Sequence, residues 1–393
     1  MFGTGLRHGG GRLRSAPGLR LAHIPAPVAL ALLILTVAAA AYGVSSRSSA
    51  PAGSPTVGPS FTDVQLYRDH VAFARRPSTY YAQVMEEQRR RDYPVRPFVT
   101  VRPPTLSFML AWAPGGEMTG RILLGALAVV VAGLWTTRLV TPIGAPGAAV
   151  AGLALACGVV AAFTPNGYLM HECWAGLLIA LSLGAYPGDQ SGGRSLRLAA
   201  SLGAALAACL VRELALPFLG VMALMALLER RLQETILWLG AIGLYLLALA
   251  AHAFMVIRHN LPGDPGMDWV RLGGWGFVLA ANRWNAIMTL EPWLPRLLVP
   301  AALVGSLGWG GPAGRRLAFT VLGYSAGFLV IGRPENTYWG LMIAPLLPLG
   351  WAGFIAAGVG LMTPLGEAAP ARPAPARRRR GRSPLAARGG LRR

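Results

Sequence analysis

The sequence contains no lysine, so its basic side chains are arginines and six histidines. Charged residues make up only 13% of the 393 residues, whereas 54% are hydrophobic. A soluble domain normally has about twice this share of charge, so the composition excludes an ordinary soluble globular protein. The apolar residues occur in repeated long runs, which are typical of membrane-spanning helices.

Cysteine and cofactor motifs are scarce as well. The three cysteines, Cys157, Cys173 and Cys209, lie far apart in apolar segments without CxxC spacing, which argues against a disulfide framework or a zinc site. The sequence has no Walker A, GxGxxG or HExxH motif, so nucleotide-driven transport and zincin chemistry lack support. It also has no DxD motif. We therefore predict no metal site and no cofactor, while a need for a divalent ion stays open.

The net charge of +20 comes largely from the two ends of the chain. Arginine-rich flanks of a membrane domain stay in the cytoplasm and attract anionic lipids. The run RRRRGR is also found in nucleic-acid-binding proteins, but such runs are usually solvated tails, and we predict no nucleic-acid partner. The expected organisation is a cytoplasmic tail over 1–24, a membrane domain over 25–362 and a disordered cytoplasmic tail over 363–393.

The predicted fold class is all-α, a polytopic helical bundle with about ten membrane spans and both termini in the cytoplasm. Arginines in alternate turns favour this orientation, because cytoplasmic turns are enriched in positive charge. They are Arg138, Arg194, Arg197, Arg230, Arg231, Arg315 and Arg316. The spans are predicted near 25–44, 119–137, 144–163, 167–186, 196–211, 214–229, 235–257, 294–311, 317–332 and 338–362.

A long polar insert over 45–104 separates the first two predicted spans. Long loops are translocated largely regardless of charge, so the insert is expected on the outer surface. Its sequence predicts a helix over 64–74 with Asp63 at the start, a second helix over 79–91 and a proline-rich extended run that holds Tyr93, Arg96 and Arg102. The apolar piece over 106–113 is too short to cross and predicts a re-entrant or interfacial segment.

Three residues of the insert are candidates for chemistry. Asp63 could act as a general base on an acceptor hydroxyl, or could serve only as a helix N-cap. Arg96 and Arg102 could bind a phosphate, or could pair with lipid headgroups and nearby acidic residues.

Further candidates lie in the outer turns. His171 and Glu172 open the fourth predicted span, where ionisable groups are costly unless they face a polar cavity or wet interface. Arg212 and Glu213 interrupt an apolar stretch, either as simple turn residues or with a separate partner each. Arg333 and Glu335 lie in the turn GRPENTYWG and could line the top of a cavity.

Together these motifs resemble the bacterial GT-C-type glycosyltransferases, integral membrane enzymes that use polyprenyl-phosphate-linked sugars. The resemblance covers roughly residues 25–362 and is architectural, because each motif is short. It rests on Asp63 with Tyr67 four residues later, on Tyr93-Pro94, on Arg102-Pro103-Pro104, on Glu172 and on Arg212-Glu213.

The resemblance implies that Asp63 is the catalytic base and that cavity-facing arginines bind the lipid phosphate. The implied reaction moves a sugar from a polyprenyl-phosphate donor to an envelope glycan or lipid acceptor, usually with inversion, on the outer face of the bacterial inner membrane. The full set of substrate-binding candidates is Tyr67, Arg96, Arg102, His171, Glu172, Arg212, Glu213, Arg333 and Glu335.

Two other functions remain open from the sequence. A transporter or flippase for a lipid-linked glycan would be expected to show repeated halves with broken helices, and we find no clear repeat. A non-catalytic membrane assembly protein would leave Asp63, Glu172 and Arg212 individually dispensable.

Overall fold

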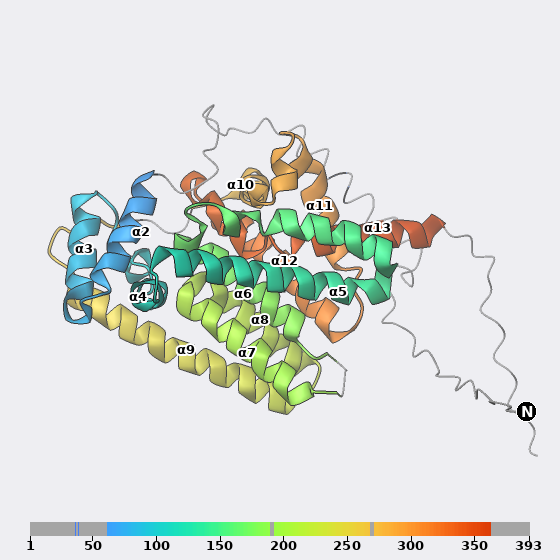
Figure 1. Cartoon of the computed structure of the whole chain (residues 1–393), viewed down its shortest axis with the longest axis horizontal. Coiled ribbons are helices and arrows are strands. Elements are labelled where there is room, and N and C mark those ends of the chain that lie inside the picture. The colour runs from blue at the N-terminus through green and yellow to red at the C-terminus, as the bar shows by residue number, and fades with distance from the viewer. Residues whose placement is uncertain (1–35, 37, 39–60, 189–191, 268–270, 363–393) are drawn as a thin grey trace, which may run out of the picture.

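The computed structural model describes residues 36, 38, 61–188, 192–267 and 271–362. These residues are helical throughout apart from turns and one isolated bridge, which confirms the predicted all-α class. Figure 1 shows a bundle in which α9 runs along one side and the insert helices gather at one end. The helices are α2 Phe61–Phe73, α3 Tyr80–Arg90, α4 Thr105–Trp112, α5 Glu117–Gly158, α6 His171–Ala185, α7 Arg194–Val211, α8 Leu216–Leu228, α9 Leu232–Arg258, α10 Gly274–Ala281, α11 Leu294–Ser306, α12 Gly311–Val330 and α13 Leu347–Met362.

Short 3₁₀ helices join many of these elements. They are η2 Pro77–Thr79, η3 Phe98–Thr100, η4 Val160–Phe163, η5 Gly167–Leu169, η6 Glu213–Ala215, η7 Asn282–Trp284, η8 Ala286–Thr289 and η9 Pro334–Met342.

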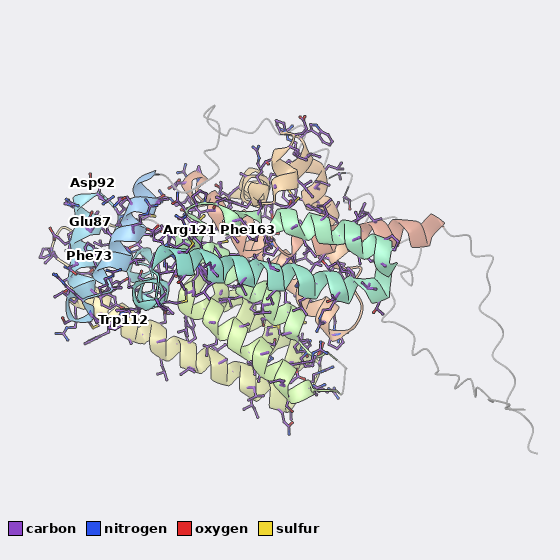
Figure 2. All side chains as sticks on the ribbon, in the orientation of Figure 1. Phe73, Glu87, Asp92, Trp112, Arg121 and Phe163 are labelled. Carbon is purple, nitrogen blue, oxygen red and sulfur yellow. The ribbon has the colours of Figure 1, made fainter. Side chains whose placement is uncertain are left out.

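The insert folds much as its sequence predicts. Helices α2 and α3 correspond to the expected helices over 64–74 and 79–91, with Asp63 in the first turn of α2. The short apolar piece forms α4, whose Trp112 indole donates a hydrogen bond to the carbonyl oxygen of Ala74 at 3.3 Å. Figure 2 shows Phe73, Glu87 and Trp112 together at this end of the molecule. The extended run is only partly correct, because η3 interrupts it before Arg102.

The 42-residue helix α5 is a hairpin rather than one rod. Gly144 has φ 72° within the sequence TPIGAP, a conformation that breaks the helix between two prolines. The two arms then pack side by side, because a Cβ at Gly152 would lie 2.7 Å from the Thr136 hydroxyl oxygen. The following η4 also returns to the first arm, since a Cβ at Gly125 would lie 3.4 Å from the Phe163 ring. The predicted spans 119–137 and 144–163 therefore fall largely in separate arms of one element.

Within the described ranges, three helices are long and apolar enough to cross a membrane, namely α5, α7 and α9. A fourth span is added if η9 and the start of α13, which meet at 66°, form one broken span. The ten predicted spans are not supported. Helix α6 has 15 residues and α8 and α11 have 13 each, and 15 residues reach only about 22 Å against a hydrocarbon core of about 30 Å. Most of the predicted span over 25–44, and both predicted tails, lie outside the described residues.

Exposed apolar side chains cover the outer faces of α5 and α9. So many large exposed apolar side chains along helix faces are rare on soluble monomers and suit contact with lipid. The most exposed are Val129, Val150 and Leu153 on α5 and Leu232, Ile236 and Leu247 on α9, with exposed fractions from 62% to 71%.

Helices α11 and α13 approach closely through glycines. A Cβ at Gly305 would lie 1.9 Å from the carbonyl oxygen of Gly350, and a Cβ at Gly353 would lie 2.2 Å from that of Gly305. Small residues let helix backbones meet in this way, which is a common basis of helix association in membranes.

We therefore expect Gly305→Ala to destabilise the bundle by about 1–3 kcal/mol, because the added methyl group must push the two backbones apart. Gly323→Ala in α12 is the matched control, since nothing lies within 4 Å of its Cβ position. The comparison is a thermal melt of each variant in the same detergent. Equal melting temperatures for Gly305→Ala and the unaltered protein would contradict the close packing.

Candidate functional site

The insert packs against the turns that our topology placed on the same face. Arg68 donates to the side-chain oxygen of Asn166 at 3.1 Å, in the turn before α6. Arg89 pairs with Asp264 at 2.7 Å, in the turn after α9, and the backbone N–H of Val95 donates to the carbonyl of Pro265. We call this the insert end of the bundle. Its position outside the membrane remains a prediction from arginine bias.

Ionisable and aromatic side chains from five segments meet just beneath the insert. We call this group the polar cluster. Its members come from α2, the segment before α4, the start of α6, the α7–α8 junction and η9. They are Tyr67, His70, Arg102, His171, Glu172, Arg212, Glu213 and Tyr338.

The centre of the polar cluster is the ion pair of Arg212 with Glu172. Nε of Arg212 lies 2.6 Å from Oε1 of Glu172, Nη1 also donates to Glu213, and the first two side chains are 0% and 1% exposed. Glu172 is in the first turn of α6 and Arg212 caps the C-terminus of α7. Helix dipoles favour a carboxylate and a cation at these two positions, so each charge is helped by its own helix.

Arg102 joins the insert to this ion pair. Its Nη2 donates to the hydroxyls of Tyr338 at 3.1 Å and Tyr67 at 3.3 Å, and lies 3.7 Å from Oε1 of Glu172. Burial lowers the pKa of Arg102. The surrounding tyrosine and glutamate oxygens favour its positive charge more strongly, so the pKa of Arg102 is raised above its ordinary value. Arg102 therefore stays charged in a buried place.

Tyr67 lies between two buried histidines. The ring centroids of His171 and His70 are 5.4 Å and 6.3 Å from that of Tyr67, both edge-on. Burial raises the pKa of Tyr67; Arg102 opposes this, and the carboxylates of Glu172 and Asp63 add to it. Asp63, Tyr67 and His70 are spaced i, i+4, i+7 and so share one face of α2.

Asp63 lies at the side of the polar cluster, on the first turn of α2. It is partly buried, and its carboxylate accepts a hydrogen bond from the hydroxyl of Tyr93, in the run that follows α3. Asp63 is therefore oriented by a second segment of the insert, next to Tyr67.

Several buried atoms of the polar cluster have no hydrogen-bond partner among the described residues. The donors are Nε of Arg102 and Nη2 of Arg212, and the acceptor is Oε2 of Glu213. Both ring nitrogens of His171 are also buried without a hydrogen-bond partner. Each such atom costs about 1–3 kcal/mol unless a ligand or water satisfies it. The polar cluster therefore offers both donors and acceptors to a ligand that itself carries anionic oxygens and hydroxyl groups.

Some predicted site residues lie elsewhere. Nη2 of Arg96 donates to the carbonyl of Leu261 at 2.5 Å, and its backbone forms the isolated bridge with Gly266. Arg333 donates to Glu335 at 2.6 Å in a surface pair in which Glu335 is 53% exposed. The structure thus brings six predicted residues into the polar cluster and places these three outside it.

Sequence reasoning did not select His70 or Tyr338, nor Tyr93 as the partner of Asp63. His70 could have been found from its spacing, because it lies seven residues after Asp63 on the same helical face. Tyr338 had no comparable signal, since it reaches Arg102 across 236 positions of sequence.

The described part of the chain has no cluster of potential metal ligands. Among the described residues, no group of three or more His, Cys, Asp or Glu side chains is arranged to hold a metal ion.

Comparisons of the chain with known proteins do not assign it to a family. No protein-family model matches the chain, and no curated protein or solved structure matches it either.

His70 gives the fold a dependence on pH. Burial, with Arg102 and Arg91 nearby and Glu87 opposing them, lowers the pKa of His70 to about 3. An unfolded histidine titrates near 6.5, so as the pH falls below about 6.5 the unfolded state binds a proton that the folded state does not. Stability contributed by neutral His70 is therefore present above that pH and is lost on the way down to about pH 3.

We expect His70→Phe to flatten this loss. Between pH 6.5 and 5 His70 should lower the free energy of unfolding by about 2 kcal/mol, because each pH unit contributes about 1.4 kcal/mol. The measurement is the melting temperature in detergent at pH 7, 6 and 5. An unchanged acid dependence in the variant would mean that His70 is not the titrating group.

Proposed function

We propose that this chain is a membrane glycosyltransferase that moves a sugar from a polyprenyl-phosphate donor to an envelope glycan or lipid acceptor. The observation that carries the proposal is the polar cluster, in which buried donor and acceptor atoms with no hydrogen-bond partner among the described residues meet at one end of an apolar bundle. Ionisable groups buried in an apolar helix bundle are energetically costly and usually functional. A sugar phosphate has the matching chemistry, with anionic oxygens for arginine and hydroxyls for glutamate and histidine.

The transfer chemistry can be assigned to residues. Asp63, held by Tyr93, accepts the proton of the acceptor hydroxyl, whose oxygen then bonds to the anomeric carbon. The bond from that carbon to the phosphate oxygen breaks, and the electron pair leaves with the phosphate. Arg102 and Arg212 stabilise the negative charge that develops there.

The arrangement suits a donor that is part lipid and part sugar. The apolar outer faces of α5 and α9 accept the lipid chain, and the insert covers the polar end. Since Arg212 and Glu172 are almost completely buried, the insert must shift for a donor to reach them. The choice of a polyprenyl phosphate and of the outer face rests on the resemblance of the motifs and on the arginine bias.

The test is mass spectrometry of envelope glycans and lipid-linked sugars from cells that naturally carry the chain. Cells with a deletion are complemented with the unaltered protein, with Arg102→Met or with Arg96→Met, at equal abundance. We expect the deletion to lack one sugar in a glycan and to accumulate the lipid-linked donor. Arg102→Met should reproduce this defect and Arg96→Met should not, because only Arg102 belongs to the polar cluster.

Other outcomes would favour other functions. A complete glycan trapped on its lipid carrier, with every sugar present, would favour a transporter. Unchanged glycans and donors in the deletion would contradict transfer chemistry altogether.

A further inference from the structure

Two histidines of the polar cluster have no part in the transfer steps proposed above. His70 lies on α2 and is 1% exposed, and His171 opens α6 and is 2% exposed. We call them the histidine pair. All four of their ring nitrogens are buried without a hydrogen-bond partner among the described residues. Because an unpaired buried polar atom is costly, such atoms point to contact with a ligand.

Another buried histidine of this chain has the opposite arrangement. His252, on α9, is 5% exposed. Its Nδ1 lies 3.0 Å from the hydroxyl of Tyr81, and its Nε2 lies 3.0 Å from the carbonyl oxygen of Val101. Since a carbonyl oxygen can only accept, Nε2 is the donor, and Nδ1 accepts from the tyrosine. His252 therefore needs no ligand, and it fastens the insert to α9.

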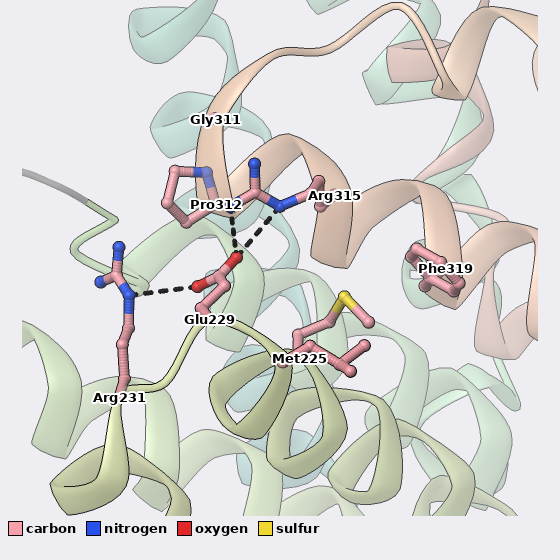
Figure 3. A pocket seen from close by; sticks show the side chains of 8 residues that line it. Met225, Glu229, Arg231, Gly311, Pro312, Arg315 and Phe319 are labelled. Atoms are coloured by element: carbon pink, nitrogen blue, oxygen red, sulfur yellow. Dashed lines mark hydrogen bonds and ion pairs between the residues drawn. The ribbon is translucent and has the colours of Figure 1, made fainter.

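The cavity between α8 and α12 is another polar site that needs no ligand for its acidic group. It has a volume of about 560 Å³. Figure 3 shows Glu229 beside it, between Arg231 and Arg315. The carboxylate of Glu229 accepts hydrogen bonds from Arg315 and Arg316 and pairs with Arg231. The chain itself satisfies this carboxylate, whereas it leaves the nitrogens of the histidine pair for another molecule.

The surroundings keep both histidines of the pair neutral. Burial, together with the nearby Arg102, lowers the pKa of His70 to about 3. Burial also opposes a positive charge on His171, and Arg102 and Arg212 add to this. A neutral imidazole has one N–H donor and one nitrogen acceptor, and a hydroxyl group can pair with both. The histidine pair is therefore complementary to hydroxyl groups rather than to anionic oxygens.

The histidine pair borders the arginine to which we assign the phosphate. The ring centroids of His70 and His171 lie 6.3 and 5.4 Å from the centroid of Tyr67. The guanidinium carbon of Arg102 lies 6.0 Å from the same centroid. A sugar joined to a phosphate on Arg102 is thus brought next to both imidazoles. Since Tyr67 and His70 belong to the insert, the shift of the insert that admits the donor also opens the pair.

We propose that His70 and His171 bind hydroxyl groups of the donor sugar and so select a sugar with free hydroxyls over a deoxygenated one. This inference rests on the proposed function, because it names what the polar cluster recognises in the donor besides the phosphate. A site built to hydrogen-bond a hydroxyl discriminates strongly against an analogue that lacks it, because the buried polar groups of the site are then left unpaired.

The test measures dissociation constants with the purified full-length protein in detergent. Farnesyl phosphate is the probe without a sugar, and farnesyl phosphates that carry mannose, galactose, glucose or arabinose are the sugar probes. We define the sugar increment as the Kd of farnesyl phosphate divided by the Kd of the tightest sugar probe. We expect an increment of about 100-fold, from about tenfold for each histidine that gains a hydroxyl partner.

Variants of the histidine pair should change the increment alone. His70→Phe and His171→Phe should each reduce it about tenfold and leave the Kd of farnesyl phosphate unchanged. Arg102→Met should weaken the binding of every probe, because it removes a phosphate contact. Deoxy analogues of the tightest probe should lose the same factor with the unaltered protein. They should lose nothing further with the variant whose histidine contacted the missing hydroxyl.

His252→Phe is the matched control, since it removes a buried histidine outside the polar cluster. It breaks two hydrogen bonds, so it should lower the melting temperature at pH 7 but keep the sugar increment. His70→Phe and His171→Phe each remove two buried nitrogens that have no hydrogen-bond partner among the described residues. Without a ligand, their melting temperatures should be unchanged or higher, whereas a purely structural role of the pair would lower them.

The possible failures are distinguishable. If farnesyl phosphate binds through Arg102 but no sugar probe binds more tightly, the inference is overturned and the proposed function stands. The inference is also overturned if His252→Phe reduces the sugar increment as much as His70→Phe does. If neither farnesyl phosphate nor any sugar probe binds, the proposed function is overturned together with the inference.

Discussion

Arg212→Met is expected to destabilise the bundle by about 3–5 kcal/mol, the usual cost of breaking a buried ion pair from one side. Methionine replaces the length of the side chain, but it leaves Glu213 without its cation and Glu172 with only the more distant Arg102, at 3.7 Å. Glu172 is 1% exposed, so water cannot easily take the place of the guanidinium. The loss should appear as a lower melting temperature or as failure to purify from the membrane.

Two comparisons make this result specific. Arg121→Met removes an arginine that is 42% exposed and pairs with Glu117 at 3.5 Å, and it should cost no more than about 1 kcal/mol. Combining Arg212→Met with Glu172→Gln should recover part of the loss, because the second change removes a buried charge that has lost its nearest partner. If Arg212→Met is as stable as Arg121→Met, the ion pair does not organise the polar cluster.

Asp63→Asn is expected to lower the rate of sugar transfer by about 10²–10⁴-fold, the range that a positioned general base supplies. Asparagine has nearly the same shape but does not accept the proton of the acceptor hydroxyl. Its amide oxygen can still accept the hydrogen bond from Tyr93, so the fold of the insert should be preserved. The measurement is transfer from a lipid-linked sugar by purified protein in detergent, with a melting temperature for each variant.

Asp69→Asn is the control for Asp63→Asn. Asp69 is on the same helix and partly buried, but it pairs with Arg91 at 2.5 Å within the insert and is not a member of the polar cluster. The same loss of charge there should leave the rate within a few-fold. Full activity of Asp63→Asn would remove it as the base and leave the buried histidines as the groups to test next.

The sequence predicted the insert better than it predicted the bundle. Helix α2 has an acidic residue, Asp63, in its first turn, and α3 ends before a proline-rich run. Such signals act within a few residues. The lengths of α6, α8 and α11 did not follow, because an apolar run does not show where a helix stops. In α6 the apolar prediction began at 167, but residues Gly167–Leu169 form a 3₁₀ turn and the helix starts at His171.

The candidate site divides in a similar way. Residue type and position in the predicted turns were enough to select Arg102, Glu172 and Arg212, because charge is rare in this chain and each charge stands out against apolar sequence. They were not enough to separate Arg102 from Arg96, which is six residues earlier in the same proline-rich run. The difference arises from η3, which redirects the backbone so that Arg96 faces Leu261 and Arg102 faces Tyr67 and Tyr338.

By itself, therefore, the sequence determined an all-α chain with long apolar helices, a helical polar insert and basic ends, because composition and local periodicity act over short distances. The tertiary structure alone decided which charges share a site. The pairs of Arg102 with Tyr338 and of Arg212 with Glu172 join distant segments, and so does the network of Glu229 with Arg315. Such pairs depend on how the helices pack, and no local pattern specifies that packing.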